Sequence, residues 1–441
     1  MSSRLRHPLT GLVGGILLTL PWILSWATGL NQTFSTLTTV GVAGVAVLGA
    51  SFLLAWGAET AEKDVPRAFA IAVLAVLAVA PEYAVDALYA WQAGQGDAAA
   101  GNLAVANMTG ANRILIGLGW SGIALFSVYQ AYGGSGDDNV VTNGKFLGDY
   151  VSLDRDISLE VAFLFLATVY AFFVPLGGGI GAIDTLFLVG LYVAYILVIV
   201  RGDVEEVEEQ VGVPAYLQAR SFPVRAVSVL ALFAYSGLLI FTAVEPFAHG
   251  LEELGLQFGI PEFFMIQWIA PLASESPELI VTAYLVNKAR STAAFNALIS
   301  SKLNQWTLLI GTLVVVYSIS AGQYGVLMFD EKQAAEIWIT AAQSFFALAV
   351  LINFNISVRE SLVLLTLFLS QVLVEFYFIR TMSEAAAEAN SIVLLHGFTA
   401  LYMVLGLGLL LSRRDEILQV AAHTRSTVSD AVGGGTEQPA D

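Results

Sequence analysis

The sequence contains no cysteine, four scattered histidines and only 12% charged residues. Without cysteine, disulfides and thiolate metal centres are excluded. The wide separation of His7, His249, His396 and His423 argues against a zinc or haem site. There is also no His-Glu-x-x-His or Gly-x-Ser-x-Gly segment for hydrolytic chemistry. We therefore expect neither an enzyme nor a resident cofactor.

Lysine is scarce as well, since five of the 19 basic residues are Lys, and the net charge is −17. A basic patch for nucleic acid is absent, so no nucleic-acid partner is expected. An acidic, lysine-poor exterior is typical of proteins that stay soluble in high salt. The composition thus indicates a halophile-like habitat.

Apolar residues are abundant, at 57% of the chain, and they form long runs from end to end. A transmembrane barrel would instead show alternating segments of about 10 residues. The pattern predicts an all-α polytopic membrane protein whose first segment is a helix and not a cleaved signal peptide. The expected spans are about 9–28, 37–58, 66–93, 97–129, 158–175, 180–200, 223–247, 261–288, 291–319, 335–353, 359–379 and 391–411, twelve in all.

Basic residues concentrate in alternate loops. With the N-terminus inside, fifteen Lys and Arg lie on the inner side, and only Lys332 and Arg380 lie outside. Arg113 and Lys302 fall within apolar segments. This asymmetry predicts an even number of spans with both termini cytoplasmic, in the plasma membrane.

Two segments of the chain resemble each other. Residues 80–117 begin "APEYAVDALY" and residues 276–311 begin "SPELIVTAYL"; each has Pro-Glu in an apolar helix, a short polar loop and a second helix with an Asn near its start. The first segment occupies the third and fourth expected helices, and the second occupies the eighth and ninth. The two are separated by five helices, an odd number, so they cross the membrane in opposite senses. Aligned from Gly117 and Gly311, the pairs are Asn102 with Asn296, Asn107 with Ser301, and Gly110 with Asn304.

Such inverted repeats are typical of secondary transporters. We expect a 5+5 inverted-topology repeat with one extra helix at each end. The expected divisions are an N-terminal arm and helix at 1–36, a first repeat at 37–200, an acidic cytoplasmic linker at 201–222, a second repeat at 223–379, an extra helix at 380–414 and a flexible tail at 415–441. A short hairpin is expected within 133–156.

Both segments resemble the alpha repeats of the cation/Ca²⁺ exchanger superfamily, which includes the sodium/calcium exchangers. That pattern is Thr/Ser-Ser-x-Pro-Glu, then Asp-x-x-x-Gly-Asn-x-x-Gly-Ser-Asn-x-x-Asn on the next helix. The matching residues are Pro81, Glu82, Asp97, Gly101, Asn102 and Asn107 in the first copy, and Ser274, Pro277, Glu278, Asn296, Ser300 and Asn304 in the second. The resemblance implies an antiporter that exchanges Ca²⁺, or a related divalent cation, for Na⁺ or H⁺ by alternating access.

The resemblance also implies that Glu82 and Glu278 are shared cation ligands, with oxygens from Ser274, Ser300 and Asn304. Ca²⁺ prefers about six to eight oxygen ligands, including carboxylates. The prolines are expected to open each helix so that carbonyls face a cavity. The alternative is a pair of capping or ion-paired carboxylates. Supporting roles are expected for Asn102, Asn107, Asn112, Asn296 and Ser301, and Asn102 and Asn296 fit helix packing equally well.

The chain departs from the family pattern at several positions. Ala106 and Gly110 replace a Ser and an Asn, and an alternative register would use Asn112. Four further ionisable residues lie near the motifs, namely Asp86, Glu275, Lys302 and Arg113. The two basic residues are either mechanistic, with Lys302 a tethered cation or proton carrier, or fixed partners that neutralise Asp86 and Glu275. Either reading favours proton coupling.

Three other functions remain to be weighed. A Na⁺/H⁺ or other monovalent cation antiporter would use the same fold, and a cation channel would lack counter-transport. "GQGD" at 94–97 fits an intramembrane aspartyl protease, but Asp86 follows Val85 instead of the required Tyr. The expected partners are the lipid bilayer and the transported cations. The oligomeric state stays open, and a monomer would suffice.

Overall fold

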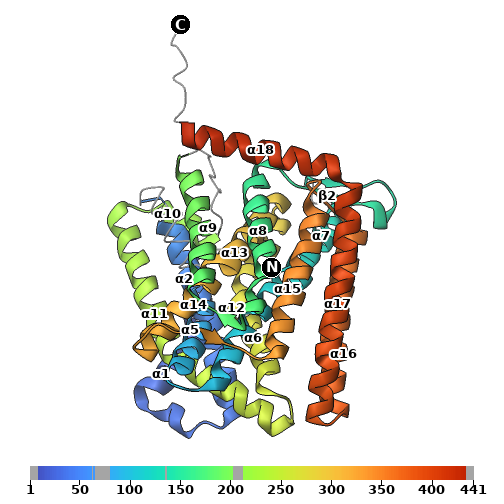
Figure 1. The fold of residues 1–441 in the computed structure, drawn as a ribbon. Coiled ribbons are helices and arrows are strands. Elements are labelled where there is room, and N and C mark those ends of the chain that lie inside the picture. The colour runs from blue at the N-terminus through green and yellow to red at the C-terminus, as the bar shows by residue number, and fades with distance from the viewer. Residues whose placement is uncertain (1–7, 62, 65–79, 135–136, 202–211, 434–441) are drawn as a thin grey trace.

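Helices make up nearly all of the chain in the computed structural model, which describes every residue except 1–7, 62, 65–79, 135–136, 202–211 and 434–441 (Figure 1). The first half contains α1 (Pro8–Thr28), α2 (Thr36–Ala61), α5 (Ala80–Gly94), α6 (Ala98–Ile114), α7 (Ser121–Tyr132), α8 (Ser158–Ala171), α9 (Ala182–Arg201) and α10 (Gly212–Gln218). The second half contains α11 (Phe222–Phe258), α12 (Glu262–Asn287), α13 (Ser291–Asn304), α14 (Ile310–Ala321), α15 (Glu331–Leu351), α16 (Val358–Thr381), α17 (Glu384–Ser412) and α18 (Arg414–Gly433).

Ten helices among the described residues are long and apolar enough to span a membrane. Their outward side chains are apolar: Phe241 is 84% exposed and Leu411 is 78% exposed. Exposed apolar side chains are unfavourable in water but not against lipid tails, so this surface is suited to a membrane. The expected count of twelve spans is not confirmed. The segments expected at 66–93 and 261–288 are not among the ten, and residues 65–79 lie outside the described part.

Two long helices contain a π-helical turn at matching places. The π-helix η4 (Leu115–Trp120) joins α6 to α7, and η8 (Gln305–Leu309) joins α13 to α14. Each composite helix packs against the other motif, because α12 contacts α6 and α7 while α5 contacts α14. This reciprocal packing is what an inverted repeat produces. π-helical turns are rare and frequently mark functional sites.

Two small sheets connect the halves of the chain. The hairpin expected within 133–156 is present, as β1 (Val140–Val141) and β2 (Tyr150–Ser152), and β2 also pairs with β5 (Asn355–Ser357). The second sheet pairs β3 (Gly179–Ile180) with β4 (Leu327–Met328). Both sheets therefore tie a loop of the first half to a loop of the second.

The prolines do not interrupt the helix that carries Glu278. The backbone of α12 stays helical through Pro271 and Pro277, so the expected opening at this place is wrong. A proline removes one helix hydrogen bond, and a helix packed on both sides tolerates that loss. In the first motif α5 begins at Ala80, next to Pro81, and residues 65–79 before it are not described.

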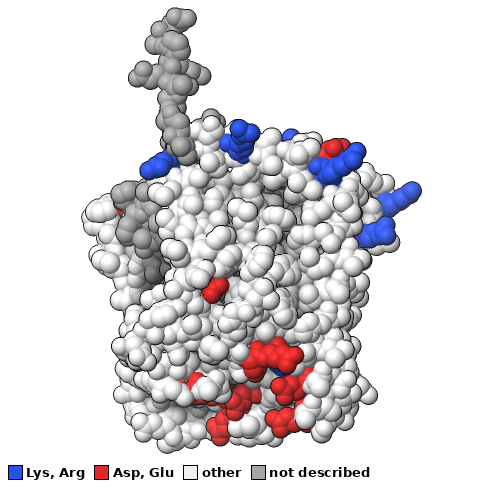
Figure 2. All heavy atoms as spheres, in the orientation of Figure 1, with Lys and Arg blue, Asp and Glu red and all other residues white. Residues whose placement is uncertain are grey.

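The C-terminal segment was expected to be a flexible tail, but its first part is a helix. The helix α18 lies across one end of the bundle and contacts α8 and α9, with Val420 buried (Figure 1). Burial of its apolar residues stabilises the helix, although the polar sequence suggested otherwise. On the face drawn in Figure 2, Lys and Arg gather at this end of the molecule, and most of the visible Asp and Glu gather at the opposite end, called here the acidic end.

Candidate cation-binding site

Two carboxylates from different halves of the chain share one hydrogen-bond donor. Gln305 Nε2, in η8, lies 3.0 Å from Glu82 Oε2 of α5 and 2.6 Å from Glu275 Oε1 of α12. Both glutamates are 2% exposed. Two acidic side chains thus meet at a single amide nitrogen in the interior, where an unpaired charge is very costly.

Glu278 joins the same cluster through a serine. Ser301 Oγ donates to Glu278 Oε1 at 3.1 Å, and Gln305 Nε2 lies 3.4 Å from Ser301 Oγ. Ser301 and Gln305 are four residues apart, so they lie on one helix face. Glu82, Glu275, Glu278, Ser301 and Gln305 are called here the carboxylate cluster.

Within the part of the chain that the structure describes, several acceptor atoms of the cluster have no hydrogen-bond partner. They are Glu82 Oε1, Glu275 Oε2, Glu278 Oε2 and Gln305 Oε1. Leaving one buried acceptor unpaired costs about 1–3 kcal/mol, and native interiors contain few such atoms. Four oxygens of this kind in one cluster are therefore ready to bind a proton or a metal cation.

Asp86 and Asn107 form a second pair beside the cluster. Asp86 follows Glu82 by one helical turn, and its Oδ1 accepts from Asn107 Nδ2 of α6 at 2.9 Å. Asp86 Oδ2 and Asn107 Oδ1 have no hydrogen-bond partner among the described residues, and both side chains are fully buried. The pair adds a fourth carboxylate on the same face of α5.

Lys302 is held by an amide and not by a carboxylate. Its Nζ lies 3.1 Å from both the carbonyl oxygen and Oδ1 of Asn112, and 5.2 Å from the centre of the Trp306 ring. Among the described residues it forms no ion pair within 4 Å. The expectation that Lys302 neutralises Glu275 or Asp86 by direct pairing is therefore wrong for this conformation. Asn112, the residue of the alternative register, is its actual partner.

Arg113 also has a different partner from the expected ones. Its NH1 pairs with Glu336 of α15 at 2.6 Å, NH2 donates to Gln371 of α16, and the guanidinium lies 4.9 Å from the Trp268 ring centre. Among the described residues, Arg113 therefore forms no ion pair with Asp86 or Glu275. The true partner could not be predicted, because the sequence does not show that α15, which carries Glu336, packs against α6, which carries Arg113.

The network around Arg113 extends to a second buried ion pair. Lys332 Nζ lies 2.8 Å from Glu375 Oε1, and Gln371 Nε2 donates to Glu375 Oε2 at 2.8 Å. Glu375 is fully buried and Lys332 is 5% exposed. Two acids and two bases thus balance inside the bundle, and among the described residues this network shares no hydrogen bond or ion pair with the carboxylate cluster.

The other expected site residues lie at varied distances from the cluster. Asn304 Oδ1 accepts from Tyr83 OH at 3.1 Å, next to Glu82 in the chain. Ser274 donates to the carbonyl of Pro271 at 3.3 Å, and Asn102 exchanges hydrogen bonds with Asp330 at the acidic end. Within the described residues, neither Ser300 nor Asn296 bonds to a carboxylate of the cluster.

Sequence reasoning missed Gln305. Its signal was a polar residue inside an apolar run, directly after Asn304, but the ungapped alignment put Asn304 at the ligand position. Gly110, which seemed a lost ligand, has a packing reason. A Cβ there would lie 1.7 Å from the carbonyl oxygen of Gln267, so only glycine allows α6 to approach α12 this closely.

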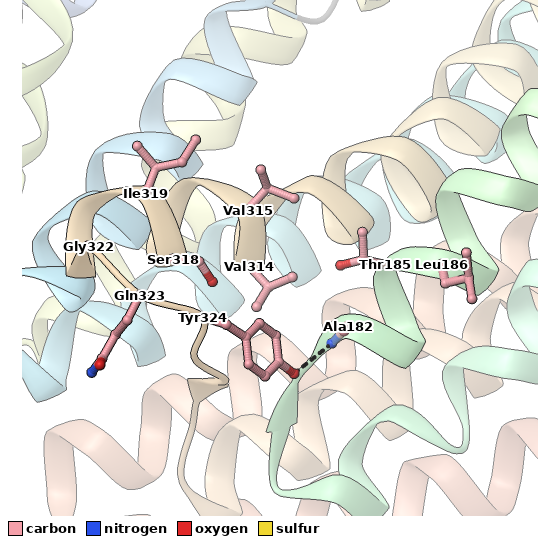
Figure 3. Close-up of a pocket in the computed structure, with 10 residues that line it drawn as sticks. All are labelled: Ala182, Thr185, Leu186, Val314, Val315, Ser318, Ile319, Gly322, Gln323 and Tyr324. Carbon is pink, nitrogen blue, oxygen red and sulfur yellow. Dashed lines mark hydrogen bonds between the residues drawn. The ribbon is translucent and has the colours of Figure 1, made fainter.

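The cluster is not arranged as a finished metal site. In the part of the chain that the structure describes, no three His, Asp or Glu side chains are grouped to hold a metal ion. A separate hollow of about 750 Å³ lies between α9 and α14, where Val314, Val315 and Leu186 present apolar side chains and Tyr324 OH accepts from the Ala182 nitrogen (Figure 3). It contains none of the carboxylates.

Comparison with known proteins agrees with these features. A family model described as sodium/calcium exchanger protein matches residues 34–201 and 228–377. A crystal structure of the H⁺/Ca²⁺ exchanger CAX is 43% identical and covers 96% of this chain and 98% of its own, with a TM-score of 0.83. The structure of native YfkE, 16% identical, covers 81% of this chain and 98% of its own with a TM-score of 0.57, which supports the fold. A search of curated proteins gave no match. The sequence resemblance is confirmed: the chain belongs to the sodium/calcium exchanger protein family.

Proposed function

We propose that the protein is a secondary active antiporter that exchanges Ca²⁺ for H⁺ by alternating access. The observation that carries this proposal is the set of four unpartnered oxygens in the carboxylate cluster. Ca²⁺ binds about six to eight oxygens, among which carboxylates supply the charge. Glu82, Glu275 and Glu278 provide that charge, with Asp86 beside them.

The position of Gln305 supports a switch between two forms of the site. Its amide nitrogen stands between two carboxylates, where a cation would be repelled. When Ca²⁺ binds, it displaces this amide nitrogen from the two carboxylates. When protons bind instead, they neutralise the same carboxylates and the amide returns. Competition for one set of oxygens couples the two fluxes.

The choice of H⁺ over Na⁺ rests on one observation. The relative that is 43% identical is described as an H⁺/Ca²⁺ exchanger. Exchange of Ca²⁺ for Na⁺ is the second outcome that the experiment below distinguishes.

We further propose that the α18 end faces the cytoplasm and that the protein lies in the plasma membrane. The concentration of Lys and Arg at that end, opposite the acidic end, supports this orientation because basic residues favour the inner side (Figure 2). The outer solution would then meet the acidic end.

Flux measurements in proteoliposomes test the function. The purified protein should take up Ca²⁺ when a pH gradient is imposed, and Glu82→Gln and Glu275→Gln should abolish this uptake. Glu160→Gln is the matched control, because Glu160 is also buried but bonds to Tyr195 away from the cluster. Uptake driven only by a Na⁺ gradient would assign Na⁺ as the coupling ion. Ca²⁺ flux without any counter-ion would indicate a channel, and no flux under either gradient would contradict the antiporter.

A further inference from the structure

A line of buried polar residues leaves the carboxylate cluster along α5. Glu82, Asp86 and Tyr89 are four and three residues apart, so they share one helix face. Asp86 and Tyr89 are both fully buried, and no described residue forms a hydrogen bond with Asp86 Oδ2. The face runs towards Gly94, where α5 ends at the acidic end.

The line continues onto α11 through hydrogen bonds. Tyr89 OH donates to Glu252 Oε1 at 2.8 Å, and Glu252 Oε2 lies 2.9 Å from His249 Nδ1. Gln92 Nε2 lies 3.2 Å from His249 Nε2, so the amide donates there and the imidazole hydrogen on Nδ1 points to Glu252. The hydrogen-bonded order is thus Gln92, His249, Glu252 and Tyr89.

Exposure rises steadily along this line. Tyr89 is fully buried, whereas the side chain of Glu252 is 18% exposed and that of His249 is 48% exposed. A group that water reaches is therefore connected, bond by bond, to a group that water does not reach.

The surroundings are acidic. The charges of Asp97 and Glu245 act on His249, and that of Glu262 acts on Tyr89. Glu262 in turn lies near Glu252 and Asp97. With no basic side chain opposing His249 among these neighbours, the local field favours an added proton.

We propose that His249, Glu252 and Tyr89 form a relay that carries protons, and not Ca²⁺, between the acidic end and Asp86. This rests on the proposed antiport with H⁺. A proton received at His249 passes to Glu252, which then donates to the Tyr89 oxygen. Once Glu252 carries the proton, the Tyr89 hydroxyl turns away from it, takes the proton of Glu252 on its oxygen and releases its own hydrogen on the side of Asp86, three residues earlier on α5, so one proton arrives and one leaves.

A divalent cation does not fit this line. Ca²⁺ requires about six to eight oxygen ligands at every stage. At Tyr89 the line offers only the Tyr89 hydroxyl and the carboxylates of Glu252 and Asp86 as oxygen ligands, which is fewer than Ca²⁺ needs. Ca²⁺ therefore uses a different route to the cluster, and a defect in the relay should leave the Ca²⁺ route intact.

Two assays on the reconstituted full-length chain separate the routes. Tyr89→Phe and Glu252→Gln should slow Ca²⁺ uptake driven by a pH gradient by about a hundredfold or more, the lower end of the range for loss of a positioned proton-transfer group. Exchange of radioactive Ca²⁺ for unlabelled Ca²⁺, which moves no net proton, should stay at the wild-type rate. Tyr170→Phe is the matched control, since Tyr170 OH bonds to Asp184 in the same way but between α8 and α9.

His249→Ala supplies the second measurement. It should flatten the dependence of proton-driven uptake on the pH at the acidic end, while Ca²⁺ self-exchange keeps its rate. If Ca²⁺ self-exchange falls together with proton-driven uptake in the folded variants, the relay is overturned. The relay is also overturned if proton-driven uptake falls in neither Tyr89→Phe nor Glu252→Gln. Wild-type protein that performs self-exchange without any response to pH would instead contradict proton coupling itself.

Discussion

Gln305 Nε2 lies 2.6 Å from Glu275 Oε1, and the same nitrogen lies 3.0 Å from Glu82 Oε2. An amide hydrogen-bonds two buried carboxylates that come from opposite halves of the chain. The relationship means that the cation-free form of the site has its own internal donor. A transported cation must compete with this amide, which gives the site two mutually exclusive arrangements.

The first prediction concerns Gln305→Leu. Without the shared donor, the cation-free protein should lose about 1–3 kcal/mol of stability, since two buried carboxylates lose a partner. Ca²⁺ restores the lost interaction, so the rise in melting temperature on adding Ca²⁺ should exceed that of wild type. Thermal unfolding in detergent with and without Ca²⁺ measures both effects.

Gln343→Leu is the control for this prediction. Gln343 is equally buried, but its amide faces the carbonyl oxygen of Arg113 at 3.5 Å and not a carboxylate. The control should lower the melting temperature without changing the increment that Ca²⁺ adds. An unchanged increment in Gln305→Leu would contradict the role of the amide.

A second prediction ranks the three glutamates. Glu275 shares the Gln305 donor with Glu82, whereas Glu278 bonds to Ser301. Glu275→Gln should therefore weaken Ca²⁺ binding as much as Glu82→Gln, by about tenfold or more, because each removes a ligand charge from the same pair. Glu278→Gln should cost less. Calorimetric Ca²⁺ titration of the purified variants measures the order, and a larger loss from Glu278→Gln than from Glu275→Gln would reverse it.

The sequence predicted the fold more fully than the site. The apolar runs and the inverted motifs follow from local composition and spacing, and both are visible without tertiary contacts. Glu82 was identified because its Pro-Glu motif recurs at Glu278. Glu275 was noticed only as an extra acid, since its importance depends on Gln305 reaching it from another helix.

Register and partner choice explain the remaining differences. The π-helix η8 begins at Gln305, whereas the ungapped alignment from Gly311 marked its neighbour Asn304 as the ligand. The partner of Arg113 is Glu336, some two hundred residues away in the sequence, and no local pattern connects them. The helix α18 was missed because its stability comes from packing on α8 and α9 and not from its polar sequence.

A third prediction concerns Lys302→Met. The ammonium is fully buried and its charge acts on Glu275, so it opposes cation binding at the cluster through a weakly screened repulsion. Its removal should strengthen Ca²⁺ binding by about tenfold, which corresponds to about 1.4 kcal/mol. Lys302→Arg retains the charge and should bind Ca²⁺ as wild type does. Weaker Ca²⁺ binding in the Met variant would show that the lysine assists the site instead.

The last prediction tests the ion pair of Arg113 and Glu336 by a double-mutant cycle. Both side chains are nearly inaccessible to solvent, at 1% and 0% exposure, and they lie 2.6 Å apart. Removing one partner from a buried pair leaves an uncompensated charge and typically costs about 3–5 kcal/mol. Arg113→Met and Glu336→Gln should each lower the melting temperature strongly, whereas the double variant should recover much of the loss. Since the pair forms no hydrogen bond or ion pair with the carboxylate cluster among the described residues, the double variant should also retain Ca²⁺ exchange in proteoliposomes. Additive losses in the double variant would show that the two residues act independently, and a stable double variant without exchange would place the pair in the transport cycle.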